Sequence, residues 1–560
     1  MQPLSEYPRP QLVRNSYICL NGKWEYAIRD KKEIPTTFDG EILVPYSPET
    51  PLSGVNKLVH PNEWLFYRTK LEFPKGFIKD KVILHFGAVD QIAEVFYNGK
   101  LIKRHAGGFL PFEMDIKPHI NTRGENELIV RVKDYTDTSF YSRGKQRLKK
   151  GGIWYSPQSG IYMPVWMESV TNDYIKSIKI TPDIDKSVVF LEVTTKCKTA
   201  TLTLGSTKYK IDCNEPVELP IKNMHLWTPE DPYLYEFSIK TEKDKVNSYF
   251  AMRKISTFKD NDGHRKIALN NQPYFMKGLL DQGYYQKGFL TPTSDKDYIN
   301  DIKLVKSLGF NTARKHIKIE SLRWYYHCDR LGLLVWQDFV NGGTEYDFTT
   351  IAFPLIFGVH HKDNKYAKFS RSDANGRAMA EDEFVETIKL LYNCPCIVLW
   401  TIFNEGWGQF DAKRIYEDVS KLDPTRLYDH ASGWHDQGVS DTKSLHVYFK
   451  RVRMPKARQV NDRAVILSEC GGYELKIKGH CTKHNKSVYQ SLRNPASLEN
   501  EYHKFINRDI LPNIPLGLSA FIYTQLSDVE DESNGFVTYD REKVKINVEN
   551  IKRDNDLVKY

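Results

Sequence analysis

The chain has 560 residues, a mass of 65.2 kDa and a formal net charge of +9. This length predicts three or four domains, and a charge this modest supports no claim for a polyanionic partner. Residues 1–17 contain no apolar core segment, and no run of about 18 apolar residues occurs anywhere, so we expect no secretory signal and no membrane span.

Cysteines and aromatic residues narrow the class further. The eight cysteines are scattered, and Cys394-Pro395-Cys396 lacks the second pair or histidine spacing of a zinc site. We therefore expect reduced thiols, a cytoplasmic protein, and neither a metal nor a cofactor. Aromatic residues make up 13% of the chain, which favours a surface that stacks on ring-shaped ligands.

Residues 1–170 show the pattern of an all-β block. The turn Asn98-Gly99 between two strand-like runs is a strong hairpin signal. Strands with short alternation recur at residues 65–73, 94–97, 127–132 and 162–168. Short strands with regular turns predict a β-sandwich.

A basic run lies inside this block, at Arg143, Lys145, Arg147, Lys149 and Lys150. A nucleic-acid site is one interpretation. Aromatic residues and glycines follow at once, however, so we interpret the run as a solvated, charged loop. We predict neither a nucleic-acid partner nor a membrane partner.

Residues 171–257 form a second all-β block, with strand-like runs at 188–193, 200–204 and 233–239. About seven short strands in fewer than about 100 residues predict an immunoglobulin-like sandwich. Neither block contains a pair of strand-end carboxylates. We therefore expect residues 1–257 to brace the barrel described next, wall one side of its pocket, or form oligomer contacts.

From residue 258 the hydrophobic period changes. Residues 295–308 carry apolar side chains at helical spacing and end at Gly309. Strand-like runs recur at 274–280, 310–316, 333–339, 397–405, 426–431, 445–449, 464–469 and 518–525, and helical patterns are clear at 320–331, 377–393, 410–422 and 498–509. Eight strands alternating with helices predict a (β/α)₈ barrel over 258–560, with its active site at the carboxyl ends of the strands.

Two of these runs end in a glutamate. The run from 397 ends in Asn404-Glu405, and the run from 464 ends in Glu469. A carboxylate at the end of a buried strand costs desolvation free energy unless it has a partner or a chemical role. Two at the same edge predict paired carboxylates for acid/base and nucleophilic catalysis. The structural alternative for either glutamate is a carboxylate that caps the next helix.

The domain order and several motifs resemble glycoside hydrolase family 2, the β-galactosidase and β-glucuronidase family. These motifs are Ser159-Gly160-Ile161-Tyr162 with Val165-Trp166 and Glu168, Asn311-Thr312-Ala313-Arg314-Lys315-His316, Asn404-Glu405, and Ser468-Glu469. The resemblance covers nearly the whole chain. It implies a multidomain β plus α/β fold: a sugar-binding jelly roll over 1–170, an immunoglobulin-like domain over 171–257, and a catalytic barrel over 258–560.

The resemblance also implies roles for the two glutamates, with Glu469 as the nucleophile and Glu405 as the acid/base. Retaining glycosidases place two carboxyls about 5–5.5 Å apart. We expect the negative Glu469 to raise the pKa of Glu405 and keep it protonated until the glycosyl ester forms.

Other strand-end side chains are candidate substrate contacts. The resemblance implies that Asn404 binds the sugar 2-hydroxyl, that Arg314 holds Glu469 ionised, and that Tyr448 donates to Glu469. A rim ion pair and barrel packing are the structural alternatives for Arg314 and Tyr448. His316 departs from the commoner family spacing, and is either a substrate contact or a structural histidine.

Asp281 and Asp338 end strands one and three, and are candidates for pairing with sugar hydroxyls. Trp407, Trp434 and Tyr523 are candidates for stacking on a pyranose or an aglycone, with rim packing as the alternative. The acidic run at 528–532 would bind a hard cation only through converging oxygens. We interpret it as a solvated loop.

These observations predict an exo-acting, retaining β-glycosidase that hydrolyses terminal non-reducing β-linked sugars of β-glycosides or oligosaccharides. An inactive carbohydrate-binding protein is the alternative from another class, and the presence of both Glu405 and Glu469 argues against it. Homo-oligomerisation stays open.

The sugar is less well specified. Family glucuronidases carry an Asn-x-Lys motif after strand eight, whereas this chain has Asn534-Gly535-Phe536, without a lysine. This favours a neutral hexoside, a β-galactoside before a β-glucoside. A β-glucuronidase or other β-hexuronidase stays open, because another loop could supply the cation, from Lys315, Lys287 or Lys362.

Overall fold

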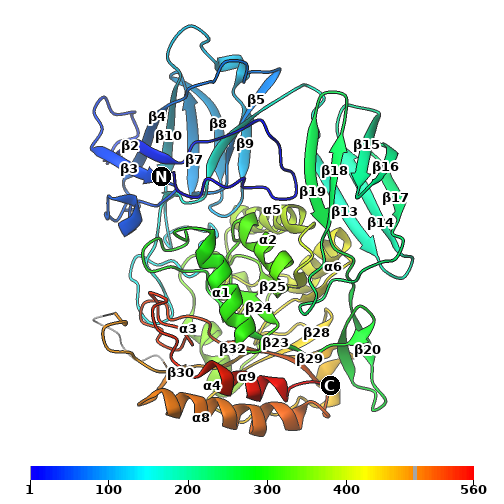
Figure 1. Ribbon diagram of the computed structural model, residues 1–560. Coiled ribbons are helices and arrows are strands. Elements are labelled where there is room, and N and C mark those ends of the chain that lie inside the picture. The colour runs from blue at the N-terminus through cyan, green and yellow to red at the C-terminus, as the bar shows by residue number, and fades with distance from the viewer. Residues whose placement is uncertain (1, 483–488) are drawn as a thin grey trace.

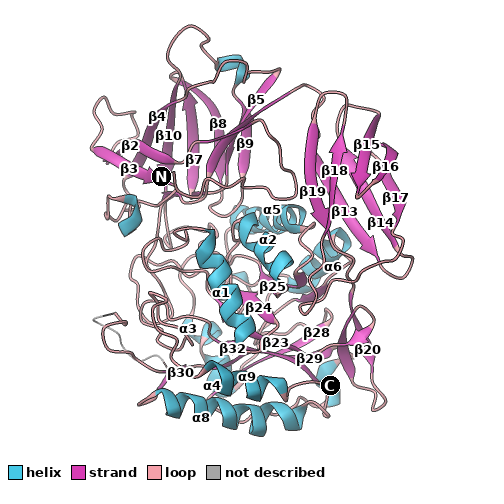
Figure 2. Ribbon diagram, viewed as in Figure 1, coloured by secondary structure: helices cyan, strands magenta, loops and turns pink. Residues whose placement is uncertain are grey.

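The computed structural model describes residues 2–482 and 489–560. Within them, two β-sandwich blocks lie against a barrel (Figure 1). Figure 2 shows that the two upper blocks consist almost wholly of strands, while the helices gather around the barrel. None of the helices in the described ranges is long and apolar enough to cross a membrane.

The first sandwich packs a six-stranded antiparallel sheet, in the order β3-β2-β4-β10-β7-β8, against a four-stranded sheet, β1-β12-β5-β9. The predicted hairpin turn is confirmed, because Asn98 and Gly99 both have positive φ, 47° and 76°, as a tight hairpin requires. The strands are β1 (Tyr17–Cys19), β2 (Gly22–Arg29), β3 (Gly40–Val44), β4 (Trp64–Lys70), β5 (Lys81–Phe86), β6 (Val89–Asp90), β7 (Ile92–Tyr97), β8 (Lys100–Ala106), β9 (Phe112–Asp115), β10 (Glu127–Lys133), β11 (Gly160–Ile161) and β12 (Val165–Val170).

The second sandwich packs the sheet β13-β14-β17 against the sheet β16-β15-β18-β19 around its own apolar core. Every second residue of a strand points inward, as Ile178 and Ile180 do in β13. Its strands are β13 (Ser177–Asp183), β14 (Val188–Thr194), β15 (Thr199–Leu204), β16 (Thr207–Asp212), β17 (Pro216–Pro220), β18 (Tyr235–Lys240) and β19 (Lys245–Phe250).

The barrel consists of eight parallel strands in the order β27-β26-β25-β24-β23-β32-β29-β28. It is nearly closed, because the backbone N–H of Asp441 donates to the carbonyl of Tyr428 across the seam, at 3.2 Å. The strands are β23 (Met276–Asp281), β24 (Thr312–Lys315), β25 (Leu334–Asp338), β26 (Ile397–Thr401), β27 (Leu427–Asp429), β28 (Thr442–Tyr448), β29 (Ala464–Gly471) and β32 (Leu518–Thr524). All eight predicted strands are therefore present.

Helices fill most gaps between these strands, as the sequence predicts. They are α1 (Asp295–Ser307), α2 (Leu322–Leu331), α3 (Phe348–Ile351), α4 (Phe353–Phe357), α5 (Ala374–Leu391), α6 (Ala412–Leu422), α7 (Ala457–Val460), α8 (Pro495–Phe505) and α9 (Val548–Asp556). Two short strands, β30 (Tyr473–Glu474) and β31 (Gln490–Ser491), pair outside the barrel.

A small sheet closes the amino-terminal end of the barrel. It consists of β20 (Ile255–Lys259), β21 (Arg265–Leu269) and β22 (Gln272–Pro273). Its apolar side chains, among them Ile267, share one cluster with Met276, Leu334 and Ala464 from the beginnings of barrel strands. The sheet therefore covers the barrel interior at the end opposite the carboxyl ends of the strands, where a site is expected.

The long loop between β10 and β11, residues 134–159, leaves the first sandwich and reaches that end of the barrel (Figure 1). Ser142 forms an isolated β-bridge with Gly342, and the Arg143 N–H donates to the Asn341 carbonyl at 3.0 Å. Backbone pairing thus fixes part of the sandwich against the loop that follows β25.

Candidate active site

A cavity of about 500 Å³ opens at the carboxyl ends of the barrel strands. Both predicted glutamates, Glu405 and Glu469, line it, together with His316 and Tyr448. One oxygen of each carboxylate and a ring nitrogen of His446 all lie within 4.8 Å of one another. The carboxylate pair inferred from two separate strand ends is thus brought together.

Glu469 lies near the end of β29, where the register with both neighbouring strands shifts. Arg314 Nη1 donates to its Oε1 at 3.0 Å, and the Tyr448 hydroxyl donates to its Oε2 at 2.5 Å. Burial alone would raise the pKa of Glu469, but the charges of His446, Arg314 and His316 and the Tyr448 hydrogen bond lower it to about 2. This carboxylate is therefore ionised across the neutral range.

Glu405 stands in a different setting. The strand β26 ends at Thr401, four residues earlier than we predicted, so Glu405 belongs to the loop beyond it. Its φ is 51°, a left-handed value that is uncommon outside glycine. The loop is held because the Glu405 N–H donates to the Ser432 carbonyl at 3.0 Å, and Trp434 Nε1 donates to the Glu405 carbonyl at 3.0 Å.

His446 lies between the two carboxylates. Its Nδ1 is 2.9 Å from Glu405 Oε1 and 3.8 Å from Glu469 Oε2, and its Nε2 is 3.0 Å from Ser432 Oγ. Burial raises the pKa of Glu405; the His446 hydrogen bond lowers it, and the negative charge of Glu469 raises it again. The net shift is upward, so the two carboxyls have pKa values displaced in opposite directions.

We did not predict His446, although the sequence contained a signal for it. His446 and Tyr448 are two residues apart in β28, and residues at that spacing point to the same face of a strand. Once Tyr448 is placed at the site, His446 follows from the same alternation.

Arg314 connects the predicted polar residues. Its Nη2 donates to Asn404 Oδ1 at 2.8 Å, and its Nε donates to Asp338 Oδ1 at 2.9 Å. The other Asp338 oxygen is 2.8 Å from His316 Nδ1. Asp338 thus lies behind Arg314 and His316 and holds both in place, which corrects its predicted position as a sugar contact.

Asn404 has one side-chain atom left over. Its Nδ2 is buried and has no hydrogen-bonding partner among the residues that the structure describes. A buried donor without a partner costs free energy, of the order of 1–3 kcal/mol. Asn404, next to Glu405, therefore keeps one hydrogen-bond donor unused within the described part of the chain.

The predicted position of Asp281 was wrong. Leu280 lines the cavity, so its neighbour Asp281 points away from it. Asp281 accepts a hydrogen bond from Lys315 Nζ at 2.8 Å, and Lys315 also pairs with Glu320 at 3.3 Å. This buried ion cluster lies outside the barrel, so it also removes Lys315 as a cation for a sugar carboxylate.

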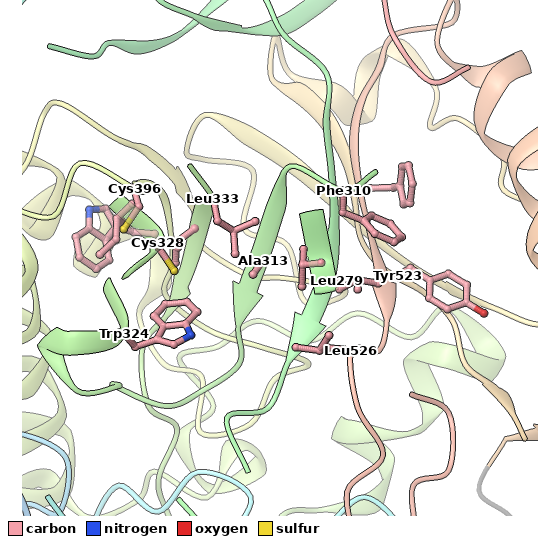
Figure 3. Close-up of a cluster of buried hydrophobic side chains, with 14 of the residues drawn as sticks. Leu279, Phe310, Ala313, Trp324, Cys328, Leu333, Cys396, Tyr523 and Leu526 are labelled. Atoms are coloured by element: carbon pink, nitrogen blue, oxygen red, sulfur yellow. The ribbon is translucent and has the colours of Figure 1, made fainter. Parts of the chain in front are cut away.

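Tyr523 was also placed on the wrong face. Its side chain is fully buried in the apolar cluster around the barrel (Figure 3), where its ring stacks on Phe536 with centroids 5.0 Å apart. The next residue, Thr524, lines the cavity instead. The alternation of β32 thus turns Tyr523 outward toward α8, where Tyr502 packs against it.

The two predicted tryptophans do line the cavity. Trp407 is buried and meets the His316 ring edge-on, with centroids 6.0 Å apart. Trp434 is half-buried and meets the His446 ring edge-on at 5.5 Å. Each tryptophan ring therefore packs against one of the two histidines near Glu405 and Glu469.

The first sandwich walls one side of the cavity, through Lys145, Arg147, Ile153 and Trp154. The basic run is therefore not a solvated loop throughout, because Arg143 and Lys145 are only 2% and 5% exposed, whereas Lys149 and Lys150 are exposed as predicted. Local sequence gave no signal for these contacts, since they depend on where the loop crosses the barrel.

The acidic run is not a solvated loop either. Glu532 is fully buried and lines the cavity, where its Oε2 lies 3.4 Å from Lys145 Nζ. It also accepts hydrogen bonds from the Tyr155 and Tyr489 hydroxyls. Asp528 pairs with Lys545 at 2.5 Å. Both of these carboxylates are thus neutralised by lysines.

The cavity therefore contains one ionised carboxylate, Glu469, and one carboxyl with a raised pKa, Glu405. A substrate atom bound between the two could contact both groups. Such a pair can attack an electrophilic carbon from one side and deliver a proton to its leaving group from the other.

Three family models match the chain. They are the sugar binding domain of glycosyl hydrolases family 2 at residues 46–167, glycosyl hydrolases family 2 at 169–253, and the TIM barrel domain of the same family at 263–464. The matched ranges correspond to the first sandwich, the second sandwich and the barrel.

Curated relatives are similar over part of their length. A β-galactosidase of Thermoanaerobacter pseudethanolicus is 26% identical over 64% of this chain and 47% of the relative. A putative β-glucuronidase of Formosa agariphila is 24% identical over 66% of this chain and 42% of the relative. The chain thus spans less than half the length of these relatives.

Solved structures match over the whole chain. A β-D-glucuronidase of Dictyoglomus thermophilum has a TM-score of 0.76 at 18% identity, covering 99% of both chains. A family 2 β-galacturonidase of Eisenbergiella tayi has a TM-score of 0.74 at 18% identity, covering 99% of this chain and 100% of that one. At this identity the match shows a shared fold.

Proposed function

Because the chain belongs to glycoside hydrolase family 2, we propose that it is an exo-acting, retaining β-glycosidase. It removes a terminal β-linked hexose from the non-reducing end of its substrate, with Glu469 as the nucleophile and Glu405 as the acid/base. The observation that carries this proposal is the pair of carboxylates within 4.8 Å whose pKa values shift in opposite directions.

The separation of the pair supports retention of configuration. Retaining enzymes place the two carboxyls about 5–5.5 Å apart, whereas inverting enzymes need about 6.5–9.5 Å to admit a water molecule. One oxygen of Glu405 and one oxygen of Glu469 lie within 4.8 Å of each other, which is closer to the retaining spacing than to the inverting one. Direct attack by a carboxylate is the reaction that this spacing favours.

The reaction then has two steps. A Glu469 oxygen forms a bond to the anomeric carbon while the glycosidic bond breaks, and Glu405 gives its proton to the departing oxygen. The resulting ester removes the charge of Glu469, so the pKa of Glu405 falls. Glu405 then takes a proton from water, and the water oxygen displaces Glu469 from the anomeric carbon.

The surrounding residues prepare these two groups. Arg314 and Tyr448 stabilise the carboxylate form of Glu469, and His446 orients Glu405 through the hydrogen bond at 2.9 Å. Asn404 directs its unpaired Nδ2 to the sugar, where a 2-hydroxyl would complete its hydrogen bonding. His316 lines the cavity and contributes a further sugar contact.

We propose a neutral hexose as the sugar, with β-galactosides first. A uronate would need a cation that is not already neutralised. Of the three lysines considered from the sequence, Lys315 is buried in an ion cluster, and Lys287 and Lys362 are exposed and do not line the cavity. The β-galactosidase relative supports the same choice.

One observation favours a β-hexuronidase as the second candidate. Lys145 lines the cavity, and its distances to Glu532 and to the Tyr155 hydroxyl are long, both 3.4 Å. A sugar carboxylate could compete with Glu532 for this ammonium group. We rank it second because Glu532 already balances the charge of Lys145.

Two measurements test the proposal. A panel of nitrophenyl β-glycosides compared by kcat/KM, with galactoside, glucoside, glucuronide and galacturonide, identifies the sugar. Proton NMR of the first product identifies the stereochemistry, and we expect the β-anomer. An α-anomer would refute direct attack by Glu469, and no turnover of any glycoside by a folded protein would favour the inactive carbohydrate-binding alternative.

A further inference from the structure

Part of the mouth of the cavity is apolar and exposed. The described chain has nine exposed large hydrophobic side chains, and four of them lie on two segments at this mouth, namely Phe348, Leu355, Phe357 and Phe449. Exposed apolar side chains are ordinary when scattered, whereas a cluster of them beside a cavity marks a binding surface.

Three of the four line the same cavity as Glu405 and Glu469. Phe348 in α3 is 64% exposed, Leu355 in α4 is 37% exposed, and Phe449 directly after β28 is 51% exposed. We call these three residues, with Ile351 of α3, the apolar rim.

The rim is built on side-chain packing within its own segment. The Phe348 and Phe353 rings meet edge-on with centroids 5.8 Å apart, and the Phe353 and Phe357 rings do so at 5.3 Å. Phe348 is therefore packed on Phe353 while much of its side chain stays exposed.

Aromatic rings lead from the nucleophile to the rim. The Tyr448 hydroxyl donates to Glu469, and the Tyr448 ring lies 6.0 Å from the Phe449 ring. Tyr489 completes the group, at 6.0 Å from Phe449 and 5.7 Å from Tyr448. A planar group bound at the mouth would extend this series of ring contacts.

Polarity changes along the cavity. The inner part holds Glu405, Glu469, Glu532 and Lys145, which suit a hydroxyl-rich sugar. Glu345 and Tyr346 also line the cavity, but the rim side chains themselves offer no hydrogen-bonding group, so a second sugar packed on them would lose hydration without recovering hydrogen bonds from them. An apolar group would lose nothing comparable.

We propose that the apolar rim is an aglycone-binding site, selective for β-glycosides of apolar aromatic alcohols. The inference rests on the proposed glycosidase function and adds to it the class of leaving group. The sugar occupies the polar inner part, the glycosidic oxygen lies at Glu405, and the aromatic aglycone packs between Phe348 and Phe449.

The test compares three β-galactosides, with methyl, octyl and 2-(2-naphthyl)ethyl aglycones. All three leave as primary alcohols, so they make nearly the same demand on Glu405 as an acid. We expect kcat/KM for the naphthylethyl glycoside to exceed that for the methyl glycoside by about tenfold or more, with octyl between them. In the double variant F348S/F449S this ratio should fall to about one to two.

A matched control is Leu516→Ser. Leu516 is 57% exposed, like the rim residues, but precedes β32 at the opposite end of the barrel. This variant should keep the wild-type ratio. A ratio near one in the wild type, an unchanged ratio in F348S/F449S, or a larger gain for octyl than for naphthylethyl would each overturn the proposal.

A binding measurement separates this proposal from the proposed function. Calorimetry with 2-(2-naphthyl)ethanol should detect binding to the wild type and to Leu516→Ser, and none to F348S/F449S, whether or not any glycoside is hydrolysed. If none of the three glycosides is hydrolysed but the wild type still binds 2-(2-naphthyl)ethanol, the proposed glycosidase activity is refuted and the apolar binding site is not. If sedimentation shows that F348S/F449S instead breaks an oligomer, the rim is a subunit contact and the aglycone site is refuted.

Discussion

Glu405 and Glu469 are the same residue type at the same end of one barrel, yet their surroundings differ. Glu469 lies within a strand and meets Arg314 and Tyr448 directly. Glu405 lies in a loop with left-handed φ, and within the residues that the structure describes its carboxylate has one hydrogen-bonding partner, His446. Glu469 is surrounded by cations and hydrogen-bond donors. Glu405 is buried and lies close to the negative charge of Glu469.

This difference shows how position assigns opposite roles to two identical groups. Donors and cations stabilise the charged form of Glu469 and lower its pKa, while burial and the neighbouring charge favour the neutral form of Glu405. A nucleophile must be ionised and an acid must be protonated at the same pH. The predictions below each remove one part of this asymmetry.

Removal of the nucleophile should have the largest effect. Glu469→Gln keeps the shape of the side chain but cannot form a glycosyl ester, so we expect kcat to fall by about 10⁴-fold or more. The measurement is steady-state turnover of a nitrophenyl glycoside. Thermal unfolding of the variant provides the control for folding, and near wild-type kcat in a folded sample would show that another group attacks the sugar.

Removal of the acid should have an effect that depends on the leaving group. For Glu405→Ala we expect kcat/KM to fall by about 10²–10⁴-fold on an alkyl glycoside or disaccharide, because a poor leaving group needs the proton. A dinitrophenolate leaves without help, so the corresponding glycoside should lose far less. The ratio of the two losses is the quantity to measure.

The same variant tests the second step. Without a base to activate water, the ester on Glu469 should accumulate, and mass spectrometry should detect it. Azide needs no base, so it should restore turnover and give a β-glycosyl azide. Equal losses on both substrates and no effect of azide would mean that Glu405 is a binding or structural residue.

The pair of carboxylates could be predicted from the sequence, because the barrel strands are continuous apolar runs and both glutamates follow their ends, whereas the two different roles came from the resemblance to the family. The same continuity explains the errors at Asp281 and Tyr523. A strand buried on both faces carries apolar residues at every position, so the pattern does not reveal which residues point inward. Only the folded barrel shows that the side chains of Asp281 and Tyr523 point outward.

The wall made by Lys145 and Glu532 could not be predicted for another reason. These residues are far apart in the chain and meet because the β10–β11 loop crosses onto the barrel. Each looked like part of an ordinary surface run, since charged runs are usually solvated. Their mutual neutralisation is a tertiary property, absent from either segment alone.

The third prediction concerns the hydrogen bond from Tyr448. In Tyr448→Phe the ring stays and the donor to Glu469 is lost, so the pKa of Glu469 should rise above its value of about 2. Catalysis needs this carboxylate ionised, so the acid limb of kcat/KM should move to higher pH while the alkaline limb, set by Glu405, stays. We expect kcat to fall by about 10–100-fold, the usual range for a hydrogen bond to a charged group. A profile with an unmoved acid limb would mean that Tyr448 serves only in packing.

The smallest effect should come from His446, which touches both carboxyls. Its proximity lowers the pKa of Glu405 and of Glu469, so His446→Leu should raise both values. The active form has Glu469 ionised and Glu405 protonated. The acid limb should therefore move to higher pH as Glu469 becomes easier to protonate, and the alkaline limb should move the same way as Glu405 becomes harder to ionise. The whole bell-shaped pH profile of kcat/KM should therefore shift to higher pH. At neutral pH we also expect about a tenfold loss in kcat/KM, the factor that corresponds to one lost hydrogen bond. Ser432→Ala removes the partner of the other ring nitrogen, together with hydroxyl contacts to Ser444 and Ser468, and as the matched control it should leave both limbs close to their wild-type positions. Movement of one limb alone in His446→Leu would mean that His446 acts on a single carboxyl, although its ring nitrogen lies near both.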